Sequence, residues 1–151
     1  MKYLIEVFNK KDYGAPAAAG VKKRLESVGL KGVKEVSVSK IYQIEGEYKE
    51  PQIKQIAGEL LCDPVLEEFS LCELCKKNAH KVEVWIRDSS TDVIGESVQD
   101  AIAVLGYAKP KVRVANSFLI SGTFSDKELE TAVKKTFVNE VVNKFSINRC
   151  K

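Results

Sequence analysis

The sequence predicts an α+β fold of two similar repeats, which pack together as an internal dimer with a pseudo-two-fold axis. Three observations support this prediction. The segment Ile5–Phe8 returns 77 residues later as Val82–Trp85. The offset falls to 76 after the loss of one residue, and Phe69–Leu71 then returns as Phe145–Ile147. Within each repeat, the spacing of apolar residues changes between the period of strands and that of helices.

In the first repeat, residues 3–8 are rich in β-forming residues and are expected to be a strand. A helical stripe of apolar residues follows, and Gly29 closes this helix as its C-cap. Residues 36–44 alternate between apolar and polar and predict a long, half-buried strand. A second helical stripe begins after Pro51, which suits a first helical turn, and a short strand ends the repeat.

The second repeat has the same order of elements with different residues. Val82–Ile86 is the expected first strand, and Ile94–Leu105 carries the helical stripe. A long strand follows over residues 112–120. Ser125 and Glu128 form a capping box at the start of the last helix. This order predicts helices on one face of a mostly antiparallel sheet.

The repeats are placed at residues 1–72 and 80–151, with a short polar linker at residues 73–79. A unit of about seventy-five residues buries only about 60% of its unfolded surface and is marginally stable alone. Packing of the two repeats against each other would supply the missing burial. We therefore expect the function to belong to the paired unit.

The composition predicts an ordinary globular protein. The net charge is only +3 over 151 residues, which does not favour nucleic acid or an anionic membrane as a partner. No signal peptide is recognisable, and no apolar run approaches the ~20 residues that span a bilayer. We therefore expect a cytoplasmic protein with reduced cysteines.

Cys72 and Cys75 form a Cys-x-x-Cys motif, a spacing that binds zinc or cycles as a redox pair. Cys62 and His80 could complete a set of four ligands. A structural zinc site normally contains two such pairs, so we expect no metal site here. His80 is the only histidine. It is expected to be exposed and noncatalytic, because no nucleophile motif accompanies it.

The motifs resemble a known family, the small accessory subunit of phosphoribosylformylglycinamidine synthase, which is called PurS. The family opens with a Val/Ile-Glu-Val strand, which matches Ile5–Val7 and Val82–Val84. Its Asp-Pro-x-Gly loop keeps the Asp and the Gly in Asp92–Gly95, but only the Pro in Ala15–Ala18.

Two further motifs complete the resemblance. The family's Val-x-Val-x-Lys strand matches Val36–Lys40 and, without the Lys, Val112–Asn116. Its closing Asn-Pro-Val-Ile-Glu-x-Tyr segment is similar to Asp63–Phe69 and Asn139–Phe145. The tandem arrangement resembles the N-terminal domain of the large single-chain enzyme. The resemblance places partner contacts at the motif positions Lys40, Asp63, Pro64, Asp92, Gly95 and Asn139.

The resemblance implies a noncatalytic subunit in purine biosynthesis. In that complex, a glutaminase subunit releases ammonia from glutamine. A synthetase subunit uses ATP and magnesium to form the amidine. The small subunit bridges these two partners and helps to form the path for ammonia. The chain is thus expected to bind no cofactor itself, and the resemblance leaves open whether two copies pair as a homodimer.

Two alternatives remain open at the level of sequence. A tandem regulatory module of the ACT type has a similar order of elements and binds an amino acid between its halves. The loop Asp92–Gly95 resembles its ligand-binding turn. A nucleic-acid-binding module is the less favoured alternative, because the net charge is small.

Overall fold

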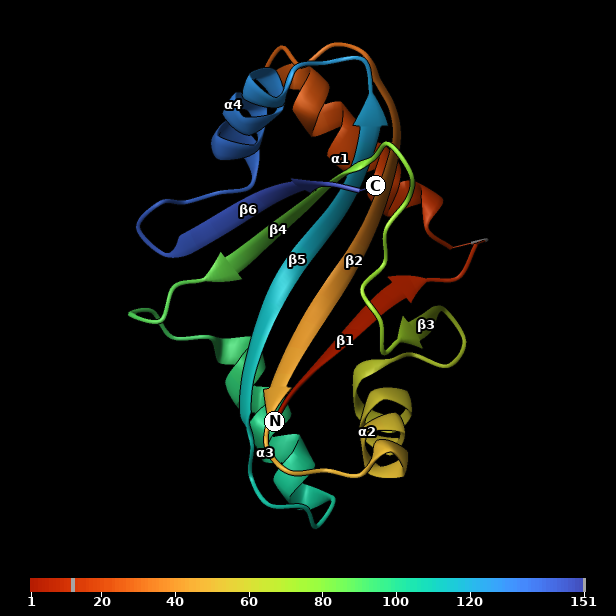
Figure 1. Ribbon diagram of the computed structural model, residues 1–151, viewed down its shortest axis with the longest axis vertical. Coiled ribbons are helices and arrows are strands. Elements are labelled where there is room, and N and C mark those ends of the chain that lie inside the picture. Colours follow the sequence, from red (N-terminus) through yellow and green to blue (C-terminus); the bar gives the residue numbers. More distant parts are fainter. Residues whose placement is uncertain (12, 151) are drawn as a thin grey trace.

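The computed structural model describes residues 1–11 and 13–150, which form one antiparallel sheet of six strands with helices packed on it (Figure 1). The strand order is β3-β1-β2-β5-β4-β6. The first half of the chain contributes β1 (Lys2–Asn9), α1 (Ala15–Ser27), β2 (Val33–Glu45), α2 (Glu50–Ile56), the π-helical turn η1 (Ala57–Leu61) and β3 (Glu67–Ser70). The second half contributes β4 (His80–Ile86), α3 (Val93–Val104), β5 (Lys111–Gly122), α4 (Asp126–Thr136) and β6 (Asn143–Arg149).

The α+β class and the antiparallel sheet confirm the prediction, and the two halves have the same order of elements. The capping box of α4 forms as expected: the Ser125 hydroxyl accepts from the Glu128 amide, and the Glu128 carboxylate accepts from the Ser125 amide. Gly29 and Gly106 follow α1 and α3 with a φ of +97°, a conformation that glycine adopts without a steric penalty. The pseudo-two-fold relation between the halves stays a prediction.

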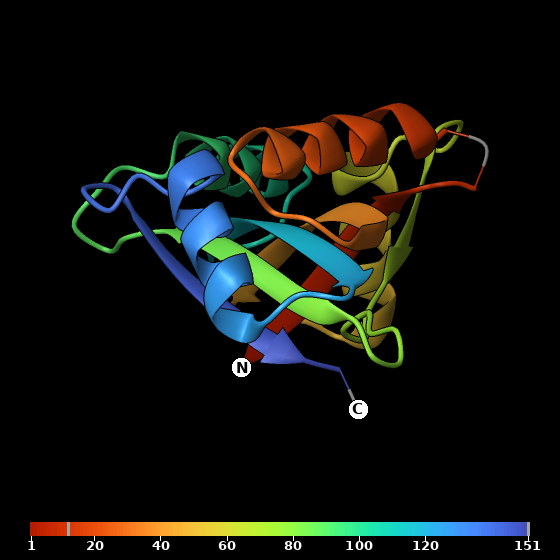
Figure 2. The ribbon, with the colours of Figure 1, turned by 90° about the horizontal axis from the view of Figure 1, so that it is seen from above.

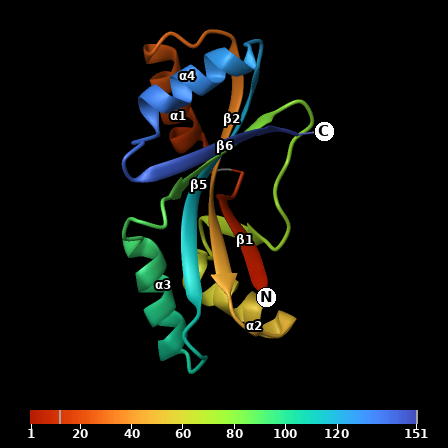
Figure 3. The ribbon, with the colours of Figure 1, turned by 60° about the vertical axis from the view of Figure 1, so that its left-hand side comes forward.

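The long strands β2 and β5 join the two halves. They pair in antiparallel register from Val33 opposite Gly122 to Glu45 opposite Lys111. Figure 1 shows these two strands running the length of the molecule, with α1 and α4 near one end and α2 and α3 near the other. Figure 3 shows the same separation from another side.

Each helix pair combines one helix from each half. Helix α1 contacts α4, and α3 contacts η1. Figure 2 shows α1 along the top of the view, with α4 beside its C-terminal end and in front of the strands. One core contains first-half residues such as Ile53 and second-half residues such as Ile102, while the other combines Leu25 with Leu129. Neither core could form from one half alone.

One predicted detail of the helices is wrong. Ile94 was assigned to the apolar stripe of α3, but its side chain is 47% exposed because it lies in the first turn, at the edge of the core. The second helical stripe is buried as expected, although its bonding changes from α-helical to π-helical after Ile56.

The linker packs over the face of the sheet that carries no helices. There, Glu6 and Lys81 are each 2% exposed and form a buried ion pair of 2.6 Å. The Leu74 amide donates to the Glu6 carboxylate at 3.0 Å, and Lys81 donates to the Leu74 carbonyl at 2.6 Å. Ser39 donates a further bond to Glu6 at 2.5 Å. The ion pair thus binds β1, β2, β4 and the linker together.

No helix within the described residues has the length and apolar character that a membrane crossing requires.

We expect Lys81→Met to lower the free energy of unfolding by roughly 3–5 kcal/mol, because it leaves the Glu6 carboxylate buried without a counter-charge. Denaturant unfolding measures this loss. The matched control is the double variant Glu6→Gln with Lys81→Met, which leaves no unpaired charge and should recover part of the stability. A Lys81→Met protein as stable as the parent would contradict this account of the linker.

Candidate functional site

Asp63 and Asn139, two of the predicted interface residues, occupy matching turns before the two edge strands. The Asp63 carboxylate accepts from the Val65 amide at 2.9 Å, and the Asn139 side chain accepts from the Val141 amide at 3.1 Å. Pro64 follows Asp63, and its carbonyl accepts a bond of 2.8 Å from Lys10. These hydrogen bonds stabilise the backbone conformation of the two turns.

The same turns expose large apolar side chains. Val65 is 65% exposed and Val141 is 79% exposed, while their neighbours Leu66 and Val142 are 40% and 38% exposed. We call residues 63–66 and 139–142 the two apolar turns. Figures 1 and 2 show the loops before β3 and β6 on opposite flanks of the molecule. Each turn thus presents two neighbouring apolar side chains to the surface.

Asp92 and Gly95 have a structural role at the start of α3. The Asp92 carboxylate accepts from the Gly95 amide at 2.8 Å and from the Val114 amide on β5 at 2.9 Å. A side chain at Gly95 would place its Cβ 2.5 Å from the Val112 carbonyl oxygen, so only glycine fits there. This pair therefore fixes α3 against the end of β5.

Lys40, the sixth predicted interface residue, lies in the middle of the sheet. It pairs with Asn116 across the β2–β5 ladder, and both residues are exposed. The two cores lie to either side along the same strands, so these polar residues separate them. Within residues 1–11 and 13–150, Lys40 has no ion-pair partner. The structure thus leaves its ammonium group available to a binding partner.

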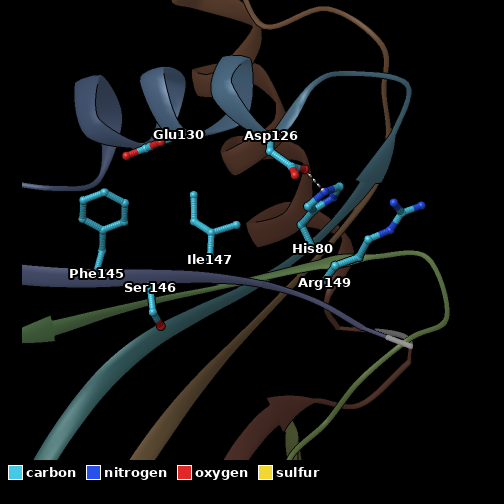
Figure 4. Close-up of a pocket in the computed structure, with 7 residues that line it drawn as sticks. All are labelled: His80, Asp126, Glu130, Phe145, Ser146, Ile147 and Arg149. Atoms are coloured by element: carbon cyan, nitrogen blue, oxygen red, sulfur yellow. Dashed lines mark hydrogen bonds and ion pairs between the residues drawn. The ribbon is translucent and has the colours of Figure 1, made fainter.

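His80 lies in a pocket of about 370 Å³ between α4 and β6, and the expectation that it is exposed is wrong (Figure 4). Its residue is 6% exposed because β4 lies inside the sheet, between β5 and β6. Its Nε2 is 2.9 Å from an Asp126 carboxylate oxygen. Of the residues drawn, Ser146 carries a hydroxyl, and Figure 4 shows it pointing away from His80 and Asp126. The histidine and aspartate therefore have no serine nucleophile beside them in this pocket.

Glu83, the counterpart of Glu6 in the second half, lies near the linker. Burial, followed by the neighbouring Glu73 carboxylate, raises the pKa of Glu83 above its ordinary value. Trp85 donates its indole N–H to Glu83 at 3.2 Å, and Lys81 lies 3.8 Å from Glu73. Lys81 thus lies close to an acid on β1, Glu6, and an acid in the linker, Glu73, which indicates a structural role for this cluster.

The cysteines differ from the prediction. Cys75 forms a disulfide with Cys150, so the expectation that all four cysteines are reduced is wrong. Cys62 and Cys72 are free thiols, and burial raises the pKa of the Cys62 thiol. No group of three or more metal-ligating side chains occurs in the part of the chain that the structure describes. Because Cys75 is bonded to Cys150, it has no free thiol, so Cys72 and Cys75 cannot bind a metal together while the disulfide is intact.

The comparison with known families matches the first half of the chain. The family model described as PurS, phosphoribosylformylglycinamidine (FGAM) synthase, matches residues 2–73. This segment is therefore a PurS-type domain, and the match connects it with FGAM synthase and purine biosynthesis. None of the curated proteins matches the chain at a significant level. The likeness of the second half to this domain rests on the sequence repeat and on the matching order of elements.

The disulfide predicts a specific thiol count. We expect two thiols, from Cys62 and Cys72, to react in the unfolded protein before reduction and all four cysteines to react afterwards. Reduction should lower the free energy of unfolding by roughly 2–4 kcal/mol, because the bond closes a long loop. Cys72→Ser is the control and should remove one thiol with little change in stability, since Cys72 is exposed. Four reactive thiols before reduction would contradict the disulfide.

Proposed function

We propose that this chain is a noncatalytic accessory subunit of FGAM synthase that binds the synthetase and the glutaminase subunits and holds them together. The observation that carries the proposal is the PurS match over residues 2–73. ATP and magnesium then belong to the synthetase partner, and the complex works in the cytoplasm. The role requires shape and surface from this chain rather than a nucleophile.

The two apolar turns support a bridging role. Each exposes a pair of large apolar residues, and the loops that carry them lie on opposite flanks of the molecule. A partner at each flank would bury these side chains without competing for the same surface. Burial of exposed aliphatic residues at about 25 cal/mol per Å² favours such contacts. We assign one partner to the turn 63–66 and the other to the turn 139–142.

The sheet keeps the two turns at a fixed separation. The turn 63–66 leads into β3 and the turn 139–142 leads into β6, which are the two edge strands of the same sheet. The long β2–β5 ladder connects the halves by backbone hydrogen bonds. The chain can therefore orient two enzymes relative to each other, which transfer of ammonia between them requires. Lys40, exposed in the middle of the sheet, is proposed as an additional contact.

Reconstitution tests this proposal. The chain is mixed with the synthetase and the glutaminase from the same cell, together with glutamine, ATP, magnesium and phosphoribosylformylglycinamide. We expect glutamine-dependent synthesis to require this chain, and the mass of the assembled complex to give the number of copies that enter. Undiminished glutamine-dependent synthesis without the chain would refute the proposal.

Substitutions in the two apolar turns test the bridging surfaces. We expect Val65→Asp and Val141→Asp each to weaken binding of one partner by at least about tenfold, because each buries a charge at an apolar contact. Separate titrations with the synthetase and with the glutaminase measure both effects. Val104→Asp is the matched control, since Val104 is 86% exposed and lies outside the turns. Equal losses in Val104→Asp, or no loss in the turn variants, would contradict the assignment.

A further inference from the structure

Strand β2 has an open edge beyond the end of β1. The register of β1 with β2 runs from Lys2 opposite Glu45 to Phe8 opposite Ser39 and stops there. Strand β2 continues to Val33, with β5 alone as its partner over this stretch. Asn9, the last residue of β1, lies opposite Val38, so no β1 residue covers this edge of β2 from Ser37 back to Val33.

The backbone groups of Val36 and Val38 point to this open edge. Along an antiparallel strand, the backbone N–H and C=O groups of successive residues point alternately toward and away from a given neighbouring strand. On β5, the Val112 and Val114 amides bond to side chains rather than to β2, so the backbone groups of every second residue from them, including Phe118 and Ile120, point away from β2. Residues directly opposite each other in such a pair both point away from the partner strand. Val38 and Val36 lie opposite Phe118 and Ile120, so their backbone groups point away from β5.

Side-chain oxygens complete the corresponding edge in the second half. Asp92 accepts from the Val114 amide at 2.9 Å, and Gln99 accepts from the Val112 amide at 3.2 Å. At the repeat offset of 77, the residues in the first half are Ala15 and Lys22, neither of which carries an acceptor oxygen. On β5, side-chain oxygens thus accept from the amides at the open edge. In the first half, Ala15 and Lys22 at the matching positions cannot accept from the corresponding amides of β2.

A cavity of about 570 Å³ lies against this edge. Its lining includes Val36 and Val38, and the small side chains of Ala15 and Ala18 lie where Asp92 and Gly95 stand in the second half. Small-molecule sites commonly have volumes of about 300–1,000 Å³. Where the second half has the Asp92 side chain, the first half therefore has a cavity large enough for a small ligand.

The charges around the cavity favour an anion. Lys10, Lys11 and Lys76 line it, and Glu6 is the acid in its lining. Glu6 is already neutralised by Lys81 at 2.6 Å. Lys76 pairs with Glu35, whereas Lys10 donates to the Pro64 carbonyl and has no ion-pair partner among residues 1–11 and 13–150. An anion within the cavity would gain from this field.

We propose that this cavity binds a small carboxylic acid, whose carboxylate accepts from the Val38 amide as Asp92 accepts from the Val114 amide. Lys10 and Lys11 of the β1–α1 loop hold its charge, and a dicarboxylate offers them a second anionic group. The cavity shares no lining residue with the pocket at His80, and it adjoins the turn 63–66 through Lys10, which donates to the Pro64 carbonyl.

Thermal unfolding of the full chain with succinate tests the proposal, with sodium chloride at equal ionic strength as the salt control. We expect succinate to raise the unfolding temperature in a saturable manner beyond chloride, because a ligand that binds the folded state stabilises it. The amide resonances of Val36 and Val38 should shift in the same titration. A succinate effect no larger than that of chloride would overturn the proposal.

Ala15→Asp supplies the carboxylate that the first half lacks. It should weaken succinate binding by at least about tenfold, because the new side chain occupies the same place. Ala17→Asp is the matched control: it adds the same charge in the same helical turn, outside the lining residues, and should keep the succinate effect. Unchanged binding in Ala15→Asp, or an equal effect of inorganic phosphate on the parent protein, would overturn a carboxylate site at this place.

Discussion

The pairing of β2 with β5 is the interaction on which the rest of the structure depends. It joins the halves through one antiparallel ladder, from Val33–Gly122 to Glu45–Lys111, so they share a sheet. Both helix pairs pack along these two strands, and each pair takes one helix from each half. Units of about seventy-five residues are only marginally stable alone. The shared cores supply further burial and fix the separation of the two flanks.

The order of elements could be predicted because its signals are local: β-forming runs, helical stripes and caps such as Ser125. The packing of α1 on α4 could not, because an apolar stripe does not specify which half covers it. The Cys75–Cys150 bond depends on the path of the linker over the sheet, which periodicity does not describe. Family motifs pointed to Asp63 and Asn139, whose side chains accept from backbone amides, whereas the exposure of Val65 and Val141 in the same segments was not predicted.

The two halves differ where a single residue decides between a closed and an open site. Lys81 compensates Glu6 across the halves, whereas Glu83 lies beside Glu73 with a raised pKa. Asp92 closes the free edge of β5, but the alanine at its counterpart leaves the edge of β2 beside a cavity. The halves thus retain a common frame while their surfaces diverge. Such divergence suits the proposed contacts with two different enzymes and the ligand site that we propose in the first half.

Native-state hydrogen exchange tests most directly whether the two halves form one structure. The amides of β2 belong to the first half and those of β5 to the second, and they bond to each other. Our account predicts that the most protected amides of both strands exchange with the same free energy, equal to that of global unfolding. Clearly different free energies for the two strands, with one half opening while the other stays folded, would contradict it.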